Sequence, residues 1–120
     1  MGNPVVHFEI GCTNRAKTQK FFAGLFNWQM EAQGSTAMID TGAEGGIDGH
    51  ITSLGHEPHN YVTFYVVVEA LAPYIEKAEK LGGKVLIPPT DIPEDEGAFA
   101  WIGDPDGNII GLWAPGTSEE

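Results

Sequence analysis

The order of predicted secondary-structure elements occurs twice along this chain, and this repeat constrains the fold most strongly. Alternating apolar and polar residues predict a strand over residues 5–10, and an apolar stripe at helical spacing predicts a helix over residues 15–26. Three short strands are expected near residues 28–33, 36–40 and 46–51. The second half repeats this order with a strand over residues 61–68, a helix over about residues 71–81, and strands over residues 84–87, 98–102 and 108–113. We therefore predict a duplicated βαβββ unit in an α+β fold.

Each predicted unit is too short to bury a sheet by itself, so we expect the two units to share a core within one domain spanning residues 1–120. We place module one at about residues 4–54, a linker at about residues 55–60 and module two at about residues 61–115. In the first helix we expect an apolar face and a basic face. The apolar face comprises Phe21, Phe22, Leu25 and Phe26, and the basic face, toward water, comprises Arg15, Lys17 and Lys20. The run of β-branched and aromatic residues at 61–68 predicts a buried strand.

The charge of the chain excludes some classes of partner. There are 6 Lys and Arg against 17 Asp and Glu, which gives a formal net charge of −11. The basic residues fall in two short stretches, residues 15–20 and 77–84, so no basic stripe is available to displace the counterions of a nucleic acid. Ligands rich in phosphate are disfavoured for the same reason. Acidity that serves only solubility is the alternative interpretation.

Apolar runs, the first residues and the cysteine count indicate where in the cell the protein is expected. No apolar run approaches the roughly 20 residues that a membrane helix needs, and residues 1–4 lack the basic and apolar order of a secretory signal. Cys12 is the only cysteine, which excludes an internal disulfide. We expect a cytoplasmic protein that contacts no membrane.

Four motifs in sequence order resemble the vicinal oxygen chelate superfamily, which groups glyoxalases, bleomycin-resistance proteins and extradiol dioxygenases. They are His7-Phe8-Glu9-Ile10, the stretch from Phe21 to Trp28, Gly82-Gly83-Lys84-Val85, and Asp104-Pro105-Asp106-Gly107-Asn108 with its continuation to Trp113. The resemblance covers His7 to Trp113. It implies two βαβββ modules whose sheets curl around a cleft, and a homodimer as the expected assembly.

The resemblance also implies a divalent metal held by up to four His or Glu side chains on the first and fourth strands of each module. His7 stands at the first of these positions, and Asp48 aligns best with the second. The corresponding residues of module two are Thr63, a poor ligand, and Gly111, which has no side chain. Two of the four ligands are therefore missing, and we expect no metal cofactor. A weak site of His7 and Asp48 is the alternative.

The remaining histidines, His50, His56 and His59, could in principle replace the missing ligands. Their spacing matches no zinc motif, so we expect them on an exposed linker.

Strand alternation places Glu9 on the same face as His7, and we take these two residues as the catalytic candidates. Such a pair could transfer protons or could be a structural ion pair. On the implied fold the same alternation assigns further side chains to the cleft. The expected ligand-binding residues are Thr63, Tyr65, Phe99, Trp101 and Trp113.

The basic residues then lie on or beside the two helices, which leaves the cleft acidic and aromatic. We expect a protein that binds a small neutral or cationic molecule. The alternative is a metal-dependent lyase, isomerase or dioxygenase of the glyoxalase type that uses His7 and Asp48.

Overall fold

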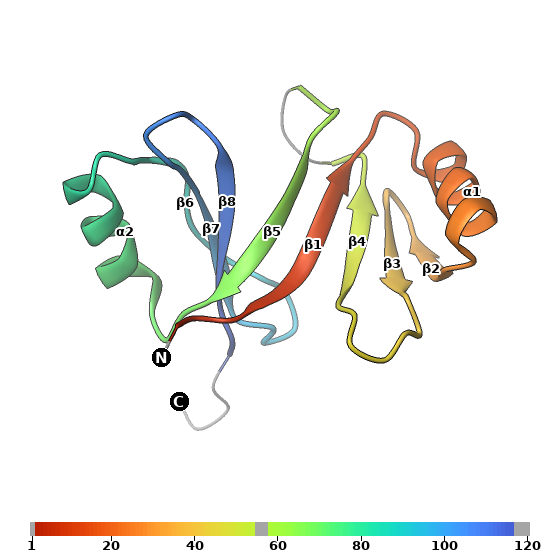
Figure 1. The fold of residues 1–120 in the computed structure, drawn as a ribbon, viewed down its shortest axis with the longest axis horizontal. Helices are drawn as coiled ribbons and strands as arrows, with labels where there is room; N and C mark the ends of the chain where they lie inside the picture. Colours follow the sequence, from red (N-terminus) through yellow and green to blue (C-terminus); the bar gives the residue numbers. More distant parts are fainter. Residues whose placement is uncertain (1, 55–57, 117–120) are drawn as a thin grey trace. The chain divides into compact units, whose positions relative to one another are not determined.

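The computed structural model describes residues 2–54 and 58–116, and within them it contains two βαβββ repeats (Figure 1). The elements are β1 (Val5–Gly11), α1 (Arg15–Phe26), β2 (Gln29–Gln33), β3 (Thr36–Asp40), β4 (Asp48–Thr52), β5 (Val62–Val67), α2 (Leu71–Lys80), β6 (Lys84–Asp91), β7 (Ala98–Gly103) and β8 (Ile109–Ala114). The predicted order of elements and the α+β class are confirmed. The linker predicted at residues 55–60 lies partly outside the described residues.

The described residues divide into two compact units. We call residues 6–54 and 58–63 the N-terminal unit, and residues 2–5 and 64–116 the C-terminal unit. The change from one unit to the other lies inside β5, after Thr63.

In the N-terminal unit the strands follow the order β2-β3-β4-β1 (Figure 1). The pairs β2/β3 and β3/β4 are antiparallel, whereas β1 and β4 are parallel. One face of this sheet is apolar and carries the buried cluster of Ala37, Ile39 and Ile51, with Phe8, Ile10, Trp28 and Met30 packed against it. The Trp28 ring contacts both Phe8 on β1 and Phe22 on α1, so this apolar face is the one that α1 covers.

Helix α1 begins and ends where short polar residues favour its termini. The side chain of Asn14 caps the helix by accepting a hydrogen bond from the Lys17 amide at 3.0 Å. The helix ends at Asn27, whose φ of 61° lies in the left-handed region that Asn tolerates.

The predicted apolar face of α1 is partly wrong. Phe22 is half-buried and stacks on Trp28, but Phe21, Leu25 and Phe26 are 60%, 59% and 51% exposed. Arg15, expected toward water, donates a hydrogen bond to the carbonyl of Gly34 at 3.1 Å. The half-buried stripe of α1 comprises residues 15, 18, 19, 22 and 23, and this leaves Phe21 and Leu25 on the outside.

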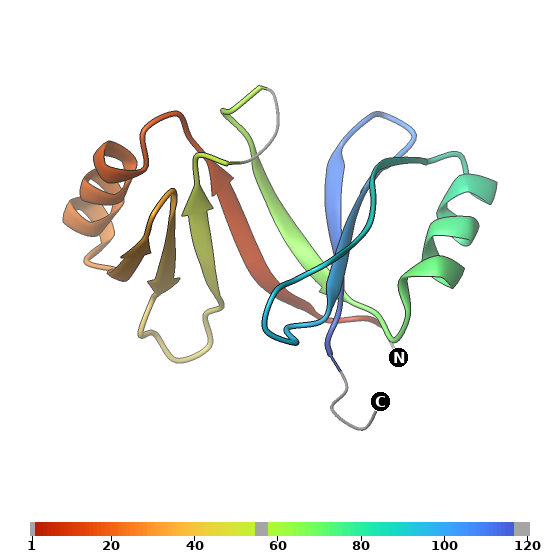
Figure 2. The same cartoon turned by 180° about the vertical axis from the view of Figure 1, so that it is seen from behind.

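In the C-terminal unit the strand order is β5-β8-β7-β6, with β5 and β8 parallel and the other pairs antiparallel (Figure 2). Helix α2 lies beside β6, β7 and β8, and its first residue joins the buried cluster of Val68, Leu71, Ala100 and Leu112. Strands β7 and β8 are joined by a tight turn, in which the Gly107 amide donates to the Asp104 carbonyl at 2.8 Å and Gly107 has a φ of 90°.

Two strands of this half differ from their prediction. The strand over residues 61–68 is not buried on both sides: Val62 and Phe64 are exposed, while Thr63 and Tyr65 are buried. Strand β6 is longer than expected and continues through Pro88 and Pro89 to Asp91. Its register with β7 shifts between Ile87 and Thr90, where the two prolines have no amide hydrogen to donate. In the described part of the chain, neither helix is long and apolar enough to span a membrane.

Candidate functional site

The face of the N-terminal sheet opposite α1 is polar, and we call it the polar face. In the parallel pair of β1 and β4, His7 lies opposite Asp48 and Glu9 lies opposite His50, and opposite residues share a face. The full set is His7, Glu9 and Gly11 on β1, Gln29, Glu31 and Gln33 on β2, Thr36, Met38 and Asp40 on β3, and Asp48, His50 and Thr52 on β4. Among these residues there are four carboxylates and two imidazoles, and neither Lys nor Arg.

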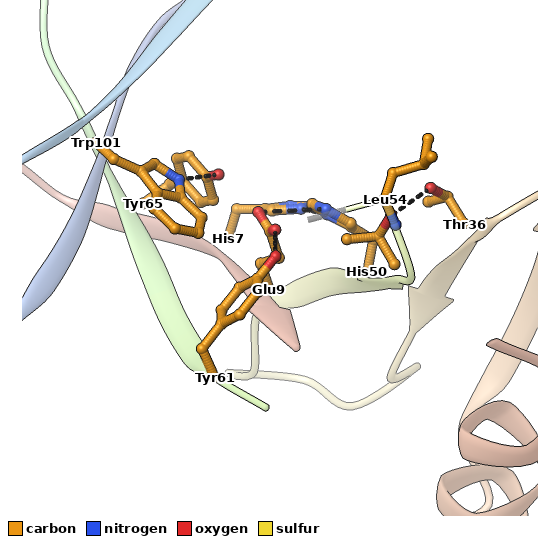
Figure 3. A network of polar contacts seen from close by, with 9 residues as sticks. His7, Glu9, Thr36, His50, Leu54, Tyr61, Tyr65 and Trp101 are labelled. Carbon is orange, nitrogen blue, oxygen red and sulfur yellow. Dashed lines mark hydrogen bonds and ion pairs between the residues drawn. The ribbon is translucent and has the colours of Figure 1, made fainter. Parts of the chain in front are cut away.

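Two histidines of the polar face are joined directly. The Nε2 atom of His7 lies 2.7 Å from the Nδ1 atom of His50, and the ring centroids are 4.9 Å apart (Figure 3). This distance requires one proton between the two nitrogens.

Glu9 continues this arrangement on the other side of His50. The Oε1 atom of Glu9 lies 3.4 Å from Nε2 of His50, and the Tyr61 hydroxyl donates a hydrogen bond to Oε2 (Figure 3). Glu9 is only 5% exposed, so the hydrogen bond from Tyr61 and the nearby His50 nitrogen compensate for lost hydration. We call His7, His50, Glu9 and Tyr61 the His–Glu–Tyr chain.

The partners assign the protons along this chain. The Glu9 carboxylate only accepts hydrogen bonds, and its Oε1 atom at 3.4 Å favours the tautomer of a neutral His50 that carries its hydrogen on Nε2. The Nδ1 atom of His50 then accepts from Nε2 of His7, and the lone pair of the His7 imidazole lies on its Nδ1 atom.

The surroundings keep His7 neutral. Burial, followed by the neighbouring His50, lowers the pKa of His7 from 6.5 to about 4, although Glu9 and Asp48 act in the opposite direction. Burial, and then the bond to Glu9, raises the pKa of Tyr61 well above its ordinary value, so the Tyr61 hydroxyl remains a donor. Near pH 7 the chain therefore contains a neutral imidazole beside a second imidazole and a buried carboxylate.

The structure corrects part of the sequence interpretation. The expectation that His7 and Glu9 share a face is confirmed, but they are connected through His50. The expectation that His50 lies on an exposed linker is wrong, because His50 is on β4. The spacing of Asp48 and His50 matches that of His7 and Glu9, and this was the available signal. His59 is half-buried, and His56 lies outside the described residues.

Asp48 has partners of its own in the turn before β4. Its Oδ1 atom accepts hydrogen bonds from the amide and the hydroxyl of Thr41, at 3.0 and 3.2 Å. Across the described ranges, no three His, Cys, Asp or Glu side chains are grouped so that they could hold a metal ion.

In the C-terminal unit, the Tyr65 ring occupies the space beside Gly111. A Cβ atom built on Gly111 would lie 2.5 Å from two ring carbons of Tyr65. A side chain at position 111 therefore cannot enter without displacing this ring. The residues at the positions that the resemblance assigns to metal ligands thus do not fit a four-ligand site.

The other expected ligand-binding residues of this unit share the face of Tyr65. The register pairs Trp101 and Tyr65 with Gly111, and Phe99 with Trp113. The Trp101 indole donates to the Tyr65 hydroxyl at 2.8 Å, and both residues are buried. Phe99 and Trp113 are half-buried, and Thr63, in the N-terminal unit, is buried. Contact of these residues with a ligand stays a prediction.

A shallow hollow lies over β2 and β3. It is lined by Gln29, Met30, Glu31, Met38, Ile39 and Asp40. Four of these residues belong to the polar face, and Met38 lies opposite His50 in the β3/β4 register. Sequence analysis missed this hollow, although the alternation of Gln29 with Glu31 and of Met38 with Asp40 was visible.

Comparison with known proteins finds a family model that matches most of this chain. The family model of the Glyoxalase/Bleomycin resistance protein/Dioxygenase superfamily matches residues 5–112. No curated protein matches this chain significantly.

Solved structures share the fold at low identity. A structure described as NAD-dependent benzaldehyde dehydrogenase from Legionella pneumophila has a TM-score of 0.68 and 19% identity, covering 92% of this chain and 97% of that one. A superfamily member from Vibrio splendidus 12B01 has a TM-score of 0.60 and 15% identity, covering 92% and 97%. Methylmalonyl-CoA epimerase from Mycobacterium tuberculosis has a TM-score of 0.62 and 11% identity, covering 96% and 89%. At these identities the likeness shows the fold alone. On the match over residues 5–112, the chain belongs to the Glyoxalase/Bleomycin resistance protein/Dioxygenase superfamily.

Proposed function

We propose that this protein binds a small neutral or cationic organic molecule on the polar face and that His7 exchanges a proton with it. The His–Glu–Tyr chain carries the proposal. It joins a neutral imidazole to a buried carboxylate through a second imidazole. This is the arrangement of a base that is oriented by a neighbour and of a carboxylate that stabilises the charge that forms.

The two histidines act together because His7 alone is a weak base. When the Nδ1 atom of His7 accepts a proton from carbon, the proton on its Nε2 atom passes to Nδ1 of His50 over 2.7 Å. The positive charge then lies on His50, whose Nε2 atom faces Glu9 at 3.4 Å. The C–H bond breaks, the substrate retains the electron pair as an enolate, and the proton resides on the imidazole pair until it is returned. Epimerisation, isomerisation and elimination next to a carbonyl group all need this step.

The charges of the polar face favour neutral or cationic ligands. Its four carboxylates meet no Lys or Arg on the same face, so the field there is negative. The hollow offers two carboxylates and a polarisable thioether to a cationic group, from Glu31, Asp40 and Met38. An acyl-CoA carries several phosphate charges that this face would repel, so acyl-CoA is not the ligand we propose.

A second candidate is a metal-dependent lyase, isomerase or dioxygenase of the glyoxalase type. The observation in its favour is the β1/β4 register, which sets His7 opposite Asp48. Against it, the Asp48 carboxylate and the His7 Nε2 atom have hydrogen-bond partners within the protein. Elemental analysis of protein purified without chelator separates the candidates. One tightly held divalent metal per chain would support the second candidate and contradict the first.

Ligand binding is tested with a pair of probes that differ in charge. We expect benzylammonium to shift the NMR signals of Met38, Glu31 and His50 and benzoate to leave them unchanged. The shifts should weaken as salt is added, because the attraction is electrostatic. Equal or stronger binding of benzoate would contradict the proposed ligand class.

Proton exchange is tested with hydroxyacetone in deuterated water. The protein should accelerate the exchange of the hydrogens next to the carbonyl group, and His7→Gln should reduce this acceleration by roughly 10²-fold or more. His59→Gln is the control, since it removes a histidine outside the His–Glu–Tyr chain. An equal loss in both variants, or no acceleration by the unmodified protein, would contradict the proposed role of His7.

A further inference from the structure

We infer that Tyr61 is a positioning residue that fixes the orientation of the Glu9 carboxylate and, through it, the proton positions on His50 and His7. The inference deepens the proposed function and rests on it for its biological meaning. Its structural content is tested on the protein without any ligand.

The first observation is that Tyr61 and His50 contact different oxygens of Glu9. The Tyr61 hydroxyl donates to Oε2, and this leaves Oε1 toward Nε2 of His50 at 3.4 Å. Glu9 is buried, so rotation that separates Oε2 from this donor removes a hydrogen bond that bulk water does not replace. The orientation of the carboxylate is therefore coupled to the hydroxyl of Tyr61.

The second observation is how Tyr61 itself is held. Gly11 lies two residues after Glu9 on β1, and its amide donates to the Tyr61 carbonyl at 2.9 Å. A Cβ atom on Gly11 would overlap the Tyr61 ring at Cε2 and Cδ2 and would also overlap the backbone carbonyl oxygen of His59. The absence of a side chain at position 11 allows the ring to lie against the strand. Because Glu9 and Gly11 share a face, the ring there points its hydroxyl back to Glu9.

These contacts determine which tautomers the histidines adopt. With Oε1 held as the acceptor opposite His50, the neutral rings both carry hydrogen on Nε2, and the His7 lone pair lies on Nδ1. Without the donor from Tyr61, the carboxylate loses a hydrogen bond that favours this orientation. The preference of His50, and in turn of His7, for the tautomer with hydrogen on Nε2 then weakens.

The first test is the ¹⁵N spectrum of the imidazoles in the full-length protein at neutral pH, where each tautomer has a distinct pair of nitrogen shifts. The unmodified protein should show predominantly the Nε2–H form of both His7 and His50. Tyr61→Phe should reduce this preference by about tenfold, while circular dichroism stays unchanged. Tyr74→Phe is the matched control, because Tyr74 is exposed and its hydroxyl accepts from Asn3 in the C-terminal unit.

The second test reverses the tautomers instead of mixing them. In Glu9→Gln the Tyr61 hydroxyl should select the amide oxygen, which turns the amide NH₂ group toward Nε2 of His50. His50 must then carry its hydrogen on Nδ1 and donate to Nε2 of His7, so both rings change to the Nδ1–H form. Adding Tyr61→Phe to Glu9→Gln should abolish this reversal. The test needs only the Glu9→Gln protein if Tyr61→Phe does not fold.

Unchanged tautomers in Tyr61→Phe, or Nε2–H histidines in Glu9→Gln, would overturn the positioning role. This outcome differs from failure of the proposed function. If the tautomers respond as expected but hydroxyacetone exchange is not accelerated, the positioning role stands and the proposed proton transfer is wrong.

Discussion

The Nε2 atom of His7 and the Nδ1 atom of His50 lie 2.7 Å apart on two adjacent parallel strands, β1 and β4. Parallel pairing sets these residues two positions out of register, since His7 lies opposite Asp48 and His50 opposite Glu9. The offset allows His50 to reach His7 with one ring nitrogen and Glu9 with the other. The chemistry proposed for this protein follows from this position of His50 between a neutral imidazole and a buried carboxylate.

The lowered pKa of His7 predicts a pH dependence of stability. The pKa is about 4 in the folded chain and 6.5 without these surroundings, so the unfolded chain binds more protons between these values. Stability contributed by His7 is therefore full above pH 6.5 and falls as the pH drops toward 4. Allowing for partial solvent screening, we expect a loss of about 1–2 kcal/mol. Urea unfolding at a series of pH values should show this loss, and His7→Gln should remove that part of it. An identical pH dependence in the variant would contradict the account.

The two neighbours of His7 should move its pKa in opposite directions. Burial is the largest cause of the low pKa of His7, and His50 lowers this pKa further. His50→Gln should therefore raise the pKa of His7, while burial still holds it below 6.5. Asp48 raises the same pKa, so Asp48→Asn should lower it further. NMR titration of the His7 ring measures both shifts. Two shifts of the same sign would show that the charges around His7 are arranged differently.

The contact between Gly111 and the Tyr65 ring predicts a cost for a single added methyl group. Gly111→Ala places Cβ 2.5 Å from the ring and should reduce the free energy of unfolding by about 1–3 kcal/mol. Gly24→Ala is the matched control: it lies in α1 with no atom near its Cβ position, and it should stabilise the chain by about 0.5–1 kcal/mol. Chemical unfolding of both variants measures the difference. A harmless Gly111→Ala would mean that the Tyr65 ring moves aside at little cost.

The orientation of α1 predicts that two adjacent phenylalanines contribute differently to the free energy of unfolding. Phe22→Ala removes a half-buried ring that stacks on Trp28 and should cost about 1–3 kcal/mol of stability. Phe21→Ala removes an exposed ring and should change stability by no more than about 0.5 kcal/mol. If both substitutions cost the same amount, the outer face of α1 is covered in solution.

The sequence was sufficient for the parts of this molecule that depend on local periodicity. The order of elements and the shared face of His7 and Glu9 both follow from patterns within a few residues. The role of His50 could not be predicted this way, because it depends on the register between β1 and β4, which are 43 residues apart at the contact. The helix face was misjudged because Phe21 and Phe22 are adjacent, and only the tertiary contact of Phe22 with Trp28 distinguishes them.

The Tyr61 contact also lies beyond local patterns. Tyr61 reaches Glu9 across 52 residues, and its ring lies against Gly11 only because that position has no side chain. A glycine at the end of a strand with alternating residues does not indicate which aromatic ring will pack against it. Likewise, Gly111 was visible as a missing ligand, but the Tyr65 ring that occupies its side-chain space became visible only in the fold.

The most direct test of the central claim is an NMR titration of the His7 ring in the unmodified protein. The account predicts a neutral ring at pH 7 with its hydrogen on Nε2, and a protonation midpoint near 4. A midpoint near 6.5 with a mixture of tautomers would contradict it, since the protein would then neither desolvate the His7 ring nor orient it through His50 and Glu9.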